Sequence, residues 1–374
     1  MPRKDCLKSV TPDAFPDAAW CQRFRRRLLA WFRRHARDLP WRRTNDPYAI
    51  WVSEIMLQQT QVATVIDYFQ RFLEAFPTIA DLAAADQQQV LRQWEGLGYY
   101  RRARQMHQAA QLIVQQHEGR FPRDMPSIVA LPGIGRYTAG AILSIAWNVR
   151  APILEANTIR LYSRLLAYRD DPTRGEGQRI LWALAEHLLP RNHCGQFNQA
   201  LMELGSEICT PRDPKCQQCP VGPLCPTKAA GLQDQIPVPN KKTIYEPLLE
   251  AALVVRRNGR ILLRRCGPDE RWAGMWDFPR FVVRQQQGKA FASEAVRRVA
   301  EMTGQQVQVE EHLTTIKHGV TRYRITLVCH GARWIDGTTD RDDLRWVTPD
   351  ELAQVPLNVS SRKISRLMIP PKRH

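Results

Sequence analysis

No apolar run in the 374-residue sequence approaches the ~18 uninterrupted residues that a membrane-spanning helix needs. Residues 1–19 carry acidic residues and prolines and have no apolar core, so this stretch does not resemble a secretory signal peptide. The chain also shows no internal repeat and no low-complexity tract. We therefore expect neither a membrane protein nor a secreted one, and we predict a cytoplasmic location.

Acidic residues are few relative to basic ones: 37 Asp and Glu stand against 54 Lys and Arg, which gives a formal net charge of +17. The resulting pI of about 9.8 favours a polyanionic partner, and nucleic acid is the polyanion that we expect. Much of the excess positive charge lies early in the chain, at Arg23, Arg25, Arg26, Arg27, Arg33, Arg34, Arg37, Arg42 and Arg43. For any single one of these arginines, we favour the simpler interpretation of a solvated helix face.

The nine cysteines divide into two sets. Five show no paired spacing, which is typical of reduced thiols inside a cell: Cys6, Cys21, Cys194, Cys266 and Cys329. The other four follow the spacing C-x6-C-x2-C-x5-C, at Cys209, Cys216, Cys219 and Cys225. Thiolates in fours hold zinc or an iron–sulfur cluster, and structural zinc usually takes two close pairs. Only one close pair is present, so we favour a cluster over zinc. Two disulfides would suit a secreted domain, which the remaining sequence disfavours.

The length suggests two domains, and the periodicity changes from helical to strand-like near residue 240. The predicted organisation is a tail at 1–19, a helical domain at 20–235, a linker at 236–247, an α+β domain at 248–366 and a tail at 367–374. In the second domain, apolar runs at 248–255 and 260–263 are separated by Arg-Arg-Asn-Gly, a hairpin signature. A further strand is predicted at 323–328 and a helix at 292–302.

A helix predicted over 50–73 carries polar side chains beside an apolar face. Its apolar face comprises Ile55, Val62, Ile66, Phe69 and Leu73. Glu54, Gln58 and Gln61 form a second stripe next to it. A carboxylate at the edge of a buried stripe is partly desolvated, so its pKa rises and it can carry a proton at neutral pH. Glutamines can bind base edges. Taken alone, however, this helix fits an ordinary amphipathic helix better.

Two glycines in Leu131-Pro132-Gly133-Ile134-Gly135-Arg136 precede a helix predicted over 137–147. They let the backbone turn tightly, and the amides that open the helix offer donors to a phosphate. The pattern therefore predicts a helix–hairpin–helix motif, in which Gly133, Gly135 and Arg136 contact a DNA backbone without reading sequence. A plain turn between two helices is the alternative.

Glu155 lies just before another helix, predicted over 156–166 and capped by Asn157 or Thr158. An acidic residue at this position can interact with the helix dipole and do nothing more. The functional alternative is a second carboxylate that faces Glu54 across a cleft.

Together these motifs resemble the MutY-type adenine DNA glycosylases of the helix–hairpin–helix superfamily, which includes endonuclease III. The resemblance runs from about residue 39 to 226 and more weakly to about 365. It rests on the hairpin, the cysteines and segments at 39–42 (LPWR), 53–62 (SEIMLQQTQV), 96–100 (GLGYY), 153–157 (ILEAN) and 197–200 (FNQA). It implies a mainly α, two-lobed glycosylase domain with a [4Fe-4S] loop and a C-terminal α+β MutT-like, or Nudix-fold, domain. It also implies excision of adenine opposite 8-oxoguanine.

The resemblance also implies roles for individual residues. Glu54 matches the glutamate that protonates the flipped adenine, and Glu155 matches an aspartate that stabilises the positive charge on the sugar. Asn157 matches an asparagine that supports this site. Tyr137 occupies the position of the lysine nucleophile of bifunctional relatives, so we expect a monofunctional enzyme that leaves an abasic site.

Contacts with the bases are implied in the same way. Tyr99 matches an aromatic that wedges into the base stack, and Gln59 matches a glutamine near 8-oxoguanine. The wall of the adenine pocket is matched by Trp41, Arg42, Leu57 and Val62. The expected partner is double-stranded DNA with adenine opposite 8-oxoguanine or guanine, bound by a monomer.

The sequence departs from the family pattern at two sites. Glu155-Ala156-Asn157 replaces Asp-Gly-Asn, and one extra methylene can move the carboxylate by about 1 Å, which can cost ~100-fold in rate. The family's Phe-Ser-His loop aligns with residues 320–322, where Thr321 keeps only the hydroxyl. The departure at Glu155 makes a catalytically weakened lesion-binding protein one alternative. Removal of thymine or uracil from mismatches is another, which residues 58–60 and the second domain disfavour. In the second domain only Glu301 remains of the acidic cluster that Nudix hydrolysis needs, so we expect a recognition module.

Overall fold

The computed structural model describes residues 15–238, 244–338 and 341–368. The predicted tail at 1–19 lies mostly outside the described residues, as do Cys6, part of the linker and most of the tail at 367–374. The described chain forms two compact units: one contains residues up to 83 and from 108 to 238, and the other contains 84–107 and the residues from 244 onward.

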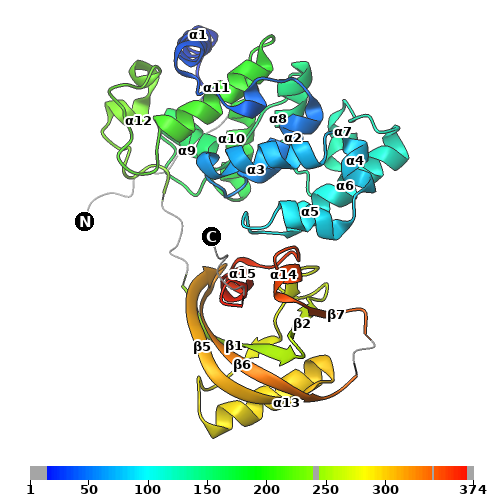
Figure 1. Cartoon of the computed structure of the whole chain (residues 1–374). Coiled ribbons are helices and arrows are strands. Elements are labelled where there is room, and N and C mark those ends of the chain that lie inside the picture. The colour runs from blue at the N-terminus through cyan, green and yellow to red at the C-terminus, as the bar shows by residue number, and fades with distance from the viewer. Residues whose placement is uncertain (1–14, 239–243, 339–340, 369–374) are drawn as a thin grey trace, which may run out of the picture. The chain divides into compact units, whose positions relative to one another are not determined.

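The first unit is built from helices (Figure 1). These are α1 (Ala18–His35), η2 (Pro40–Arg42), α2 (Pro47–Leu57), α3 (Val62–Ala75), α4 (Ile79–Ala84), α7 (Met125–Val129), α8 (Arg136–Trp147), α9 (Ala156–Leu165), α10 (Gly175–Leu188), α11 (Cys194–Glu207), η3 (Gly222–Leu224) and α12 (Pro226–Ala229). Helix α6 (Arg101–His117) begins in the second unit and ends in the first. None of the described helices combines the length and the apolar character that crossing a membrane requires.

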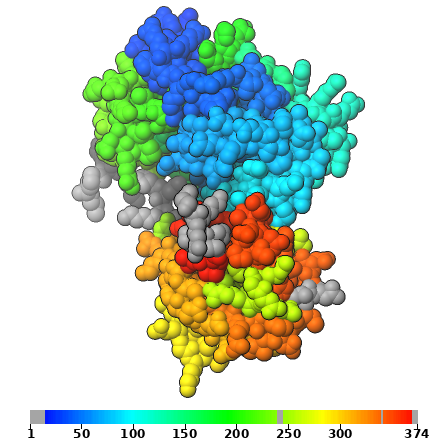
Figure 2. Space-filling model, viewed as in Figure 1, coloured from blue at the N-terminus to red at the C-terminus, as the bar shows by residue number. Residues whose placement is uncertain are grey.

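Helix α11 lies in the middle of the first unit and packs against α1, α8 and α9. Its Phe197 and Leu201 are fully buried with Phe24 and Leu28 of α1. The opposite side of α1 is on the surface (Figure 2), where Arg23, Arg26, Arg27, Arg33 and Arg34 are exposed. These five arginines therefore form the solvated face that the sequence allowed.

The predicted continuous helix at 50–73 is wrong. Helix α2 ends at Leu57 and α3 begins at Val62, with Gln59 between them in a left-handed conformation (φ 57°). Consequently Gln61 is the N-cap of the second helix, and it does not share a stripe with Glu54. Because of the break, α2 is buried on nearly all sides, whereas α3 is buried on one side only, at Val65, Phe69 and Phe72.

Helix α8 passes very close to the strand-like segment that precedes α9. A Cβ atom on Gly140 would lie 2.3 Å from the carbonyl oxygen of Pro152, so only glycine fits there. This close approach brings the start of α8 and the start of α9 into one region of the first unit, where Tyr137 and Glu155 lie.

The second unit contains a mixed sheet with the strand order β3-β2-β1-β6-β5; in addition, β4 pairs with β1 and β7 pairs with β2. Strands β1 and β6 are parallel, and the other pairs are antiparallel. The strands are β1 (Glu246–Arg257), β2 (Arg260–Arg265), β3 (Trp276–Asp277), β4 (Arg280–Val282), β5 (Gln306–Val320), β6 (Tyr323–Asp336) and β7 (Leu344–Val347). The helices are α5 (Gln87–Gln93), α13 (Lys289–Thr303), α14 (Pro349–Leu352) and α15 (Val359–Ser365).

Helices cover both faces of this sheet (Figure 1). Phe291 and Val299 of α13 pack on one face, and Leu352 and Ile364 of α14 and α15 belong to the core on the other. The predicted hairpin is confirmed, with Asn258 and Gly259 both at positive φ in the turn between β1 and β2. The strand predicted at 323–328 and the helix predicted at 292–302 are present, and both are longer than expected. Strand β1 begins inside the stretch that was assigned to the linker.

Candidate active site

Glu54 lies on the almost completely buried helix α2 and is itself 5% exposed. Its Oε2 accepts a 2.6 Å hydrogen bond from the hydroxyl of Tyr137, the second residue of α8. Burial raises the pKa of Glu54 to about 7; the negative charge of Glu155 adds to this shift, while Tyr137 and Arg42 oppose it. The carboxyl group can therefore hold a proton near neutral pH.

Tyr137 is a hydrogen-bond donor at this site and does not ionise near neutral pH. Its burial, followed by the nearby charges of Glu54 and Glu155, raises the pKa of the phenol well above its usual value. The same two carboxylates thus act on Tyr137, and the charge of Glu155 also raises the pKa of Glu54. The structure brings Glu54, Tyr137 and Glu155 together, although they are far apart in the sequence.

Glu155 is the N-cap of α9, where either Asn157 or Thr158 had been predicted, so that prediction is wrong. Its Oε2 accepts from the backbone amide of Asn157 (2.8 Å), and its Oε1 accepts from that of Thr158 (3.0 Å). The Thr158 hydroxyl in turn accepts from the Glu155 amide at 2.7 Å, which completes a capping box. Burial raises the pKa of Glu155, and the two amides partly offset this effect. These hydrogen bonds at the N-terminus of α9 therefore fix the position of the Glu155 carboxylate.

Asn157 connects Glu155 to the cysteine loop through a residue that sequence reasoning missed. Its Nδ2 lies 3.3 Å from Glu155 Oε2, and its Oδ1 accepts from Arg160 at 2.8 Å. Arg160 also donates to the carbonyl oxygens of Cys209 (2.6 Å) and Gly205 (2.7 Å). An arginine three residues after Asn157, on the same predicted helix, was the available signal.

Glu203 of α11 is a second residue that sequence reasoning missed. It is fully buried and accepts from Arg37 at 2.9 and 2.7 Å and from Arg42 at 2.8 Å. Burial alone would raise the pKa of Glu203, but these hydrogen bonds outweigh it and lower the pKa to about 2. Glu203 thereby fixes Arg42, the cation that acts on Glu54. The signal was an acidic residue in the apolar run of α11.

The residues that were predicted to line the adenine pocket, and the two glutamines that were predicted to contact bases or the lesion, lie on η2 and around the break between α2 and α3. Trp41 is buried, with its ring 5.5 Å from Phe69 and edge-on to it. Leu57, Gln58 and Val62 are half-buried, and Gln59 is exposed. The break therefore presents polar and apolar side chains at a partly open surface.

The hairpin residues lie at the start of α8. Gly133 has a φ of 77°, and Gly135 is the N-cap, with no side chain that could satisfy the first helical amides. Both glycines are exposed, as is Arg136, whose guanidinium lies 3.9 Å from the ring centre of Trp182. The backbone donors at this helix end are thus open to an anion.

Tyr99 and Thr321 both belong to the second unit and both line a cavity of about 370 Å³. Tyr99 is 52% exposed and has a φ of 46°, and Thr321 has a φ of 51°. The Thr321 hydroxyl donates to its neighbouring Val320 carbonyl oxygen at 2.7 Å. Trp272, His318 and Lys363 also line this cavity.

The four cysteines at 209–225 have free thiols and line one small cavity together. Arg164 lies beside them, 3.2 Å from the Cys209 sulfur, and also donates to three carbonyl oxygens of the surrounding loop, those of Thr210, Gln233 and Ile236. Burial raises the pKa of Cys219 to about 12, and the other three thiolates add to the shift. Four clustered thiols beside a fixed arginine fit a thiolate-bound metal group. No three Cys, His, Asp or Glu side chains in the described ranges are arranged to hold a single metal ion.

Comparison with known proteins identifies the family. Residues 52–187 match the HhH-GPD superfamily of base excision DNA repair proteins, and residues 251–367 match the NUDIX domain. The human adenine DNA glycosylase is 33% identical over 414 aligned residues, which cover 94% of this chain and 75% of the human protein. The chain belongs to the adenine DNA glycosylase family. The rat adenine DNA glycosylase is 40% identical over 79% of this chain, which spans 58% of the rat protein's length.

A solved structure supports the glycosylase fold over part of the chain. A thermostable thymine-DNA glycosylase matches with a TM-score of 0.53 and 30% identity, over 57% of this chain and 100% of that protein. The predicted fold class, a helix–hairpin–helix glycosylase domain followed by a Nudix-fold domain, is confirmed. As in the sequence-based prediction, α13 of the Nudix domain retains Glu301, and its carboxylate is paired with Arg297 and Arg298.

Proposed function

We propose that this adenine DNA glycosylase family member hydrolyses the N-glycosidic bond of adenine mispaired with 8-oxoguanine or guanine. The observation that carries this proposal is the buried Glu54, with a pKa near 7, hydrogen-bonded to Tyr137 and close enough to Glu155 for their charges to interact. Breaking this bond requires an acid for the leaving base and a negative charge near the oxocarbenium-like sugar. One protonated and one anionic carboxylate meet both needs.

In this mechanism the adenine nucleotide leaves the base stack and enters a pocket beside Trp41, Arg42, Leu57 and Val62. Glu54 delivers its proton to the purine as the bond to the sugar lengthens, and the departing base carries that proton away. Glu155, held by the first amides of α9, stabilises the cationic sugar, and Asn157 keeps the carboxylate in place. The Glu54 carboxylate then accepts a proton from the attacking water, which restores the acid.

The product is an abasic site, because Tyr137 occupies the position from which a lysine would attack the sugar. Its phenol is protonated and already bound to Glu54, so it is a poor nucleophile. Gly133, Gly135 and Arg136 bind the DNA backbone, Tyr99 fills the gap in the stack, and Gln58, Gln59 and Thr321 contact bases or the lesion. The partner is double-stranded DNA, and the enzyme acts as a monomer.

Cys209, Cys216, Cys219 and Cys225 hold a [4Fe-4S] cluster in this proposal. The cluster would link the loop at 209–225 into one rigid piece. Arg160 bonds the backbone of this loop and the side chain of Asn157, so a rigid loop supports the position of Glu155. The chemistry itself is assigned to the two carboxylates alone.

The likeness to a thymine-DNA glycosylase makes thymine removal the second candidate. Single-turnover cleavage of three duplexes separates the possibilities: adenine opposite 8-oxoguanine, adenine opposite guanine, and thymine opposite guanine. We expect an alkali-labile abasic site in the first two duplexes and none in the third. Cleavage of the thymine duplex alone would contradict the proposal, and binding without any cleavage would indicate a lesion-binding protein.

A further inference from the structure

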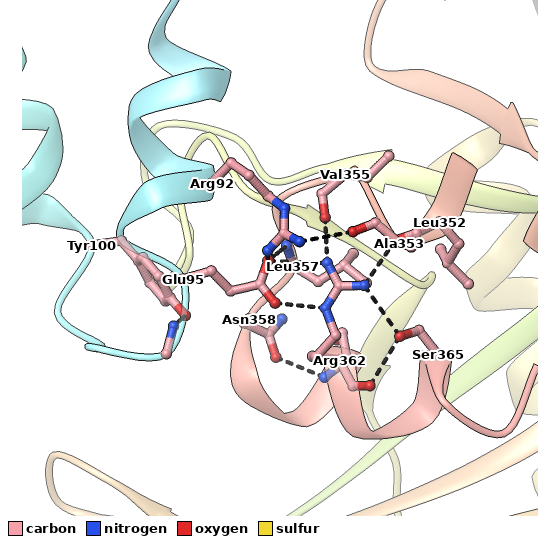
Figure 3. Close-up of polar contacts among 12 residues, drawn as sticks. Arg92, Glu95, Tyr100, Leu352, Ala353, Val355, Leu357, Asn358, Arg362 and Ser365 are labelled. Carbon is pink, nitrogen blue, oxygen red and sulfur yellow. Dashed lines mark hydrogen bonds and ion pairs between the residues drawn. The ribbon is translucent and has the colours of Figure 1, made fainter. Parts of the chain in front are cut away.

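A largely buried ion pair joins Glu95 and Arg362 inside the second unit (Figure 3). Arg362 donates to both carboxylate oxygens, from Nε at 2.5 Å and from Nη2 at 3.0 Å. The two side chains are 8% and 15% exposed. A bidentate hydrogen bond of this kind fixes the relative orientation of the two side chains as well as the distance between them.

Both partners are also bonded to the loop between α14 and α15. Arg362 donates to the carbonyl oxygens of Leu352 (2.8 Å) and Val355 (2.6 Å), and Glu95 accepts from the Leu357 amide at 3.2 Å. Arg92 adds a bond to Glu95 (3.1 Å) and one to the Ala353 carbonyl oxygen (3.0 Å). The end of α5 is therefore attached to this loop at several points, as Figure 3 shows.

A second group of contacts attaches the same segment to the turn at 272–275. Gln88 donates to the Gly274 carbonyl oxygen at 2.9 Å, and Arg104 donates to that of Ala273 at 2.5 Å. Gly274 has a φ of 79°, and a Cβ there would already touch Gln87. Residues 87–104 thus pack on two loops of the Nudix domain, although they lie within the stretch that matches the glycosylase family.

These three segments meet at the cavity that Tyr99 and Thr321 line. Tyr99 follows Glu95 by four residues, Trp272 belongs to the turn that Arg104 contacts, and Lys363 directly follows Arg362. Tyr99 and Thr321 both have a positive φ, and both are exposed loop residues. The Glu95–Arg362 pair joins the segment that precedes Tyr99 to α15.

We propose that Glu95 and Arg362 are positioning residues that set the separation of the Tyr99 loop from α15 and the Thr321 turn, and thereby the preference for the base opposite adenine. The inference rests on the proposed function. The reason is geometric: groups that must contact the same nucleotide lose selectivity when they shift by about 1 Å. Neither residue needs to touch the DNA for this effect.

The test uses the full-length protein with Arg362→Met and Glu95→Gln, separately and combined. Arg341→Met is the matched control, because Arg341 forms a more exposed pair with Asp343 (2.7 Å) in the same unit. The quantity measured is the ratio of single-turnover rates for adenine opposite 8-oxoguanine and opposite guanine. We expect each single variant to lower this ratio by about fivefold or more and the control to leave it unchanged. The double variant should lower it no further, because the two residues act as one unit.

A ratio within about twofold of the parent value in both single variants, with thermal unfolding showing a folded protein, would overturn the inference. Glu95→Gln keeps the shape of the side chain but removes its charge and one of its two acceptor oxygens, so it serves if Arg362→Met does not fold. If the parent protein cleaves neither duplex, the proposed function fails, and the inference is tested by binding instead. The measured quantity is then the ratio of Kd values for duplexes with an uncleavable abasic analogue opposite guanine or 8-oxoguanine. A parental preference that the variants lose supports the inference, and equal Kd ratios in parent and variants contradict it.

Discussion

The phenol of Tyr137 donates a 2.6 Å hydrogen bond to Oε2 of Glu54 across the contact between α8 and α2. Burial raises the pKa of Glu54, and this hydrogen bond is the largest opposing influence. The pair therefore sets the pKa of the carboxyl group near 7, where it can be protonated before the reaction and ionised after it.

Removing the phenol hydroxyl changes the pH dependence of excision in a defined direction. Because the Tyr137 hydrogen bond lowers the pKa of Glu54, Tyr137→Phe should raise it above about 7. A reaction that needs protonated Glu54 loses about tenfold in rate per pH unit above that pKa. The alkaline limb of the single-turnover rate, measured between about pH 6 and 9, should consequently move to higher pH. If the alkaline limb does not move, or moves to lower pH, Glu54 is not the group whose titration controls the rate.

The charge of Glu155 should matter more than its length. Its carboxylate is fixed by the amides of Asn157 and Thr158, and an aspartate is also a good N-cap. We expect Glu155→Asp to excise adenine at the parent rate or faster, because it keeps the charge and matches the aspartate that the family resemblance implies at this position. Glu155→Gln keeps the length and loses the charge, and it should be about 100-fold slower or worse. Equal rates for parent and Glu155→Gln, at matched DNA binding, would remove Glu155 from the mechanism.

Glu203 should contribute to both stability and catalysis. Glu203→Gln leaves Arg37 and Arg42 without their buried counter-charge, which should cost about 3 kcal/mol in the free energy of unfolding by urea. It should also slow excision, because Arg42 is no longer fixed near Glu54. Glu207→Gln is the control, since Glu207 also pairs with Arg37 but is 41% exposed, whereas Glu203 is fully buried. Equal unfolding free energies for the two variants would contradict this account of Glu203.

The cysteine loop should hold iron. Purified protein is expected to contain about four irons per chain and to absorb in the visible range, and Cys216→Ser should lose most of both. Cys266→Ser is the matched control, because Cys266 lies in the other unit and outside the loop. One zinc per chain, with no visible absorbance, would show that the four cysteines bind zinc instead of a cluster.

The sequence predicted the elements whose signals are local and left out contacts between distant residues. The turn at Asn258-Gly259 and the helix after Gly135 follow from backbone chemistry at those residues, and both are present. The break between α2 and α3 was missed, because glutamine is a good helix former and nothing at 58–61 forbids a helix.

Long-range partners could not be read from spacing. Glu203 contacts Arg37 across 166 positions, and Glu95 contacts Arg362 across 267. The role of Glu155 as the N-cap of α9 was missed for a different reason. Glutamate is an uncommon N-cap residue, and the neighbouring Asn157 and Thr158 are residue types that cap helices more often. The chemistry-bearing residue types were visible in the sequence, whereas Arg160 and Glu203, which hold such residues in place, were not.

Single-turnover excision by Glu54→Gln tests the central claim most directly. Glutamine keeps the shape of the side chain and can still accept from Tyr137, but it has no proton to donate to the base. With adenine opposite 8-oxoguanine, we predict a loss of about 100-fold or more in rate, with DNA binding unchanged. Cleavage by Glu54→Gln at the parent rate would contradict the account.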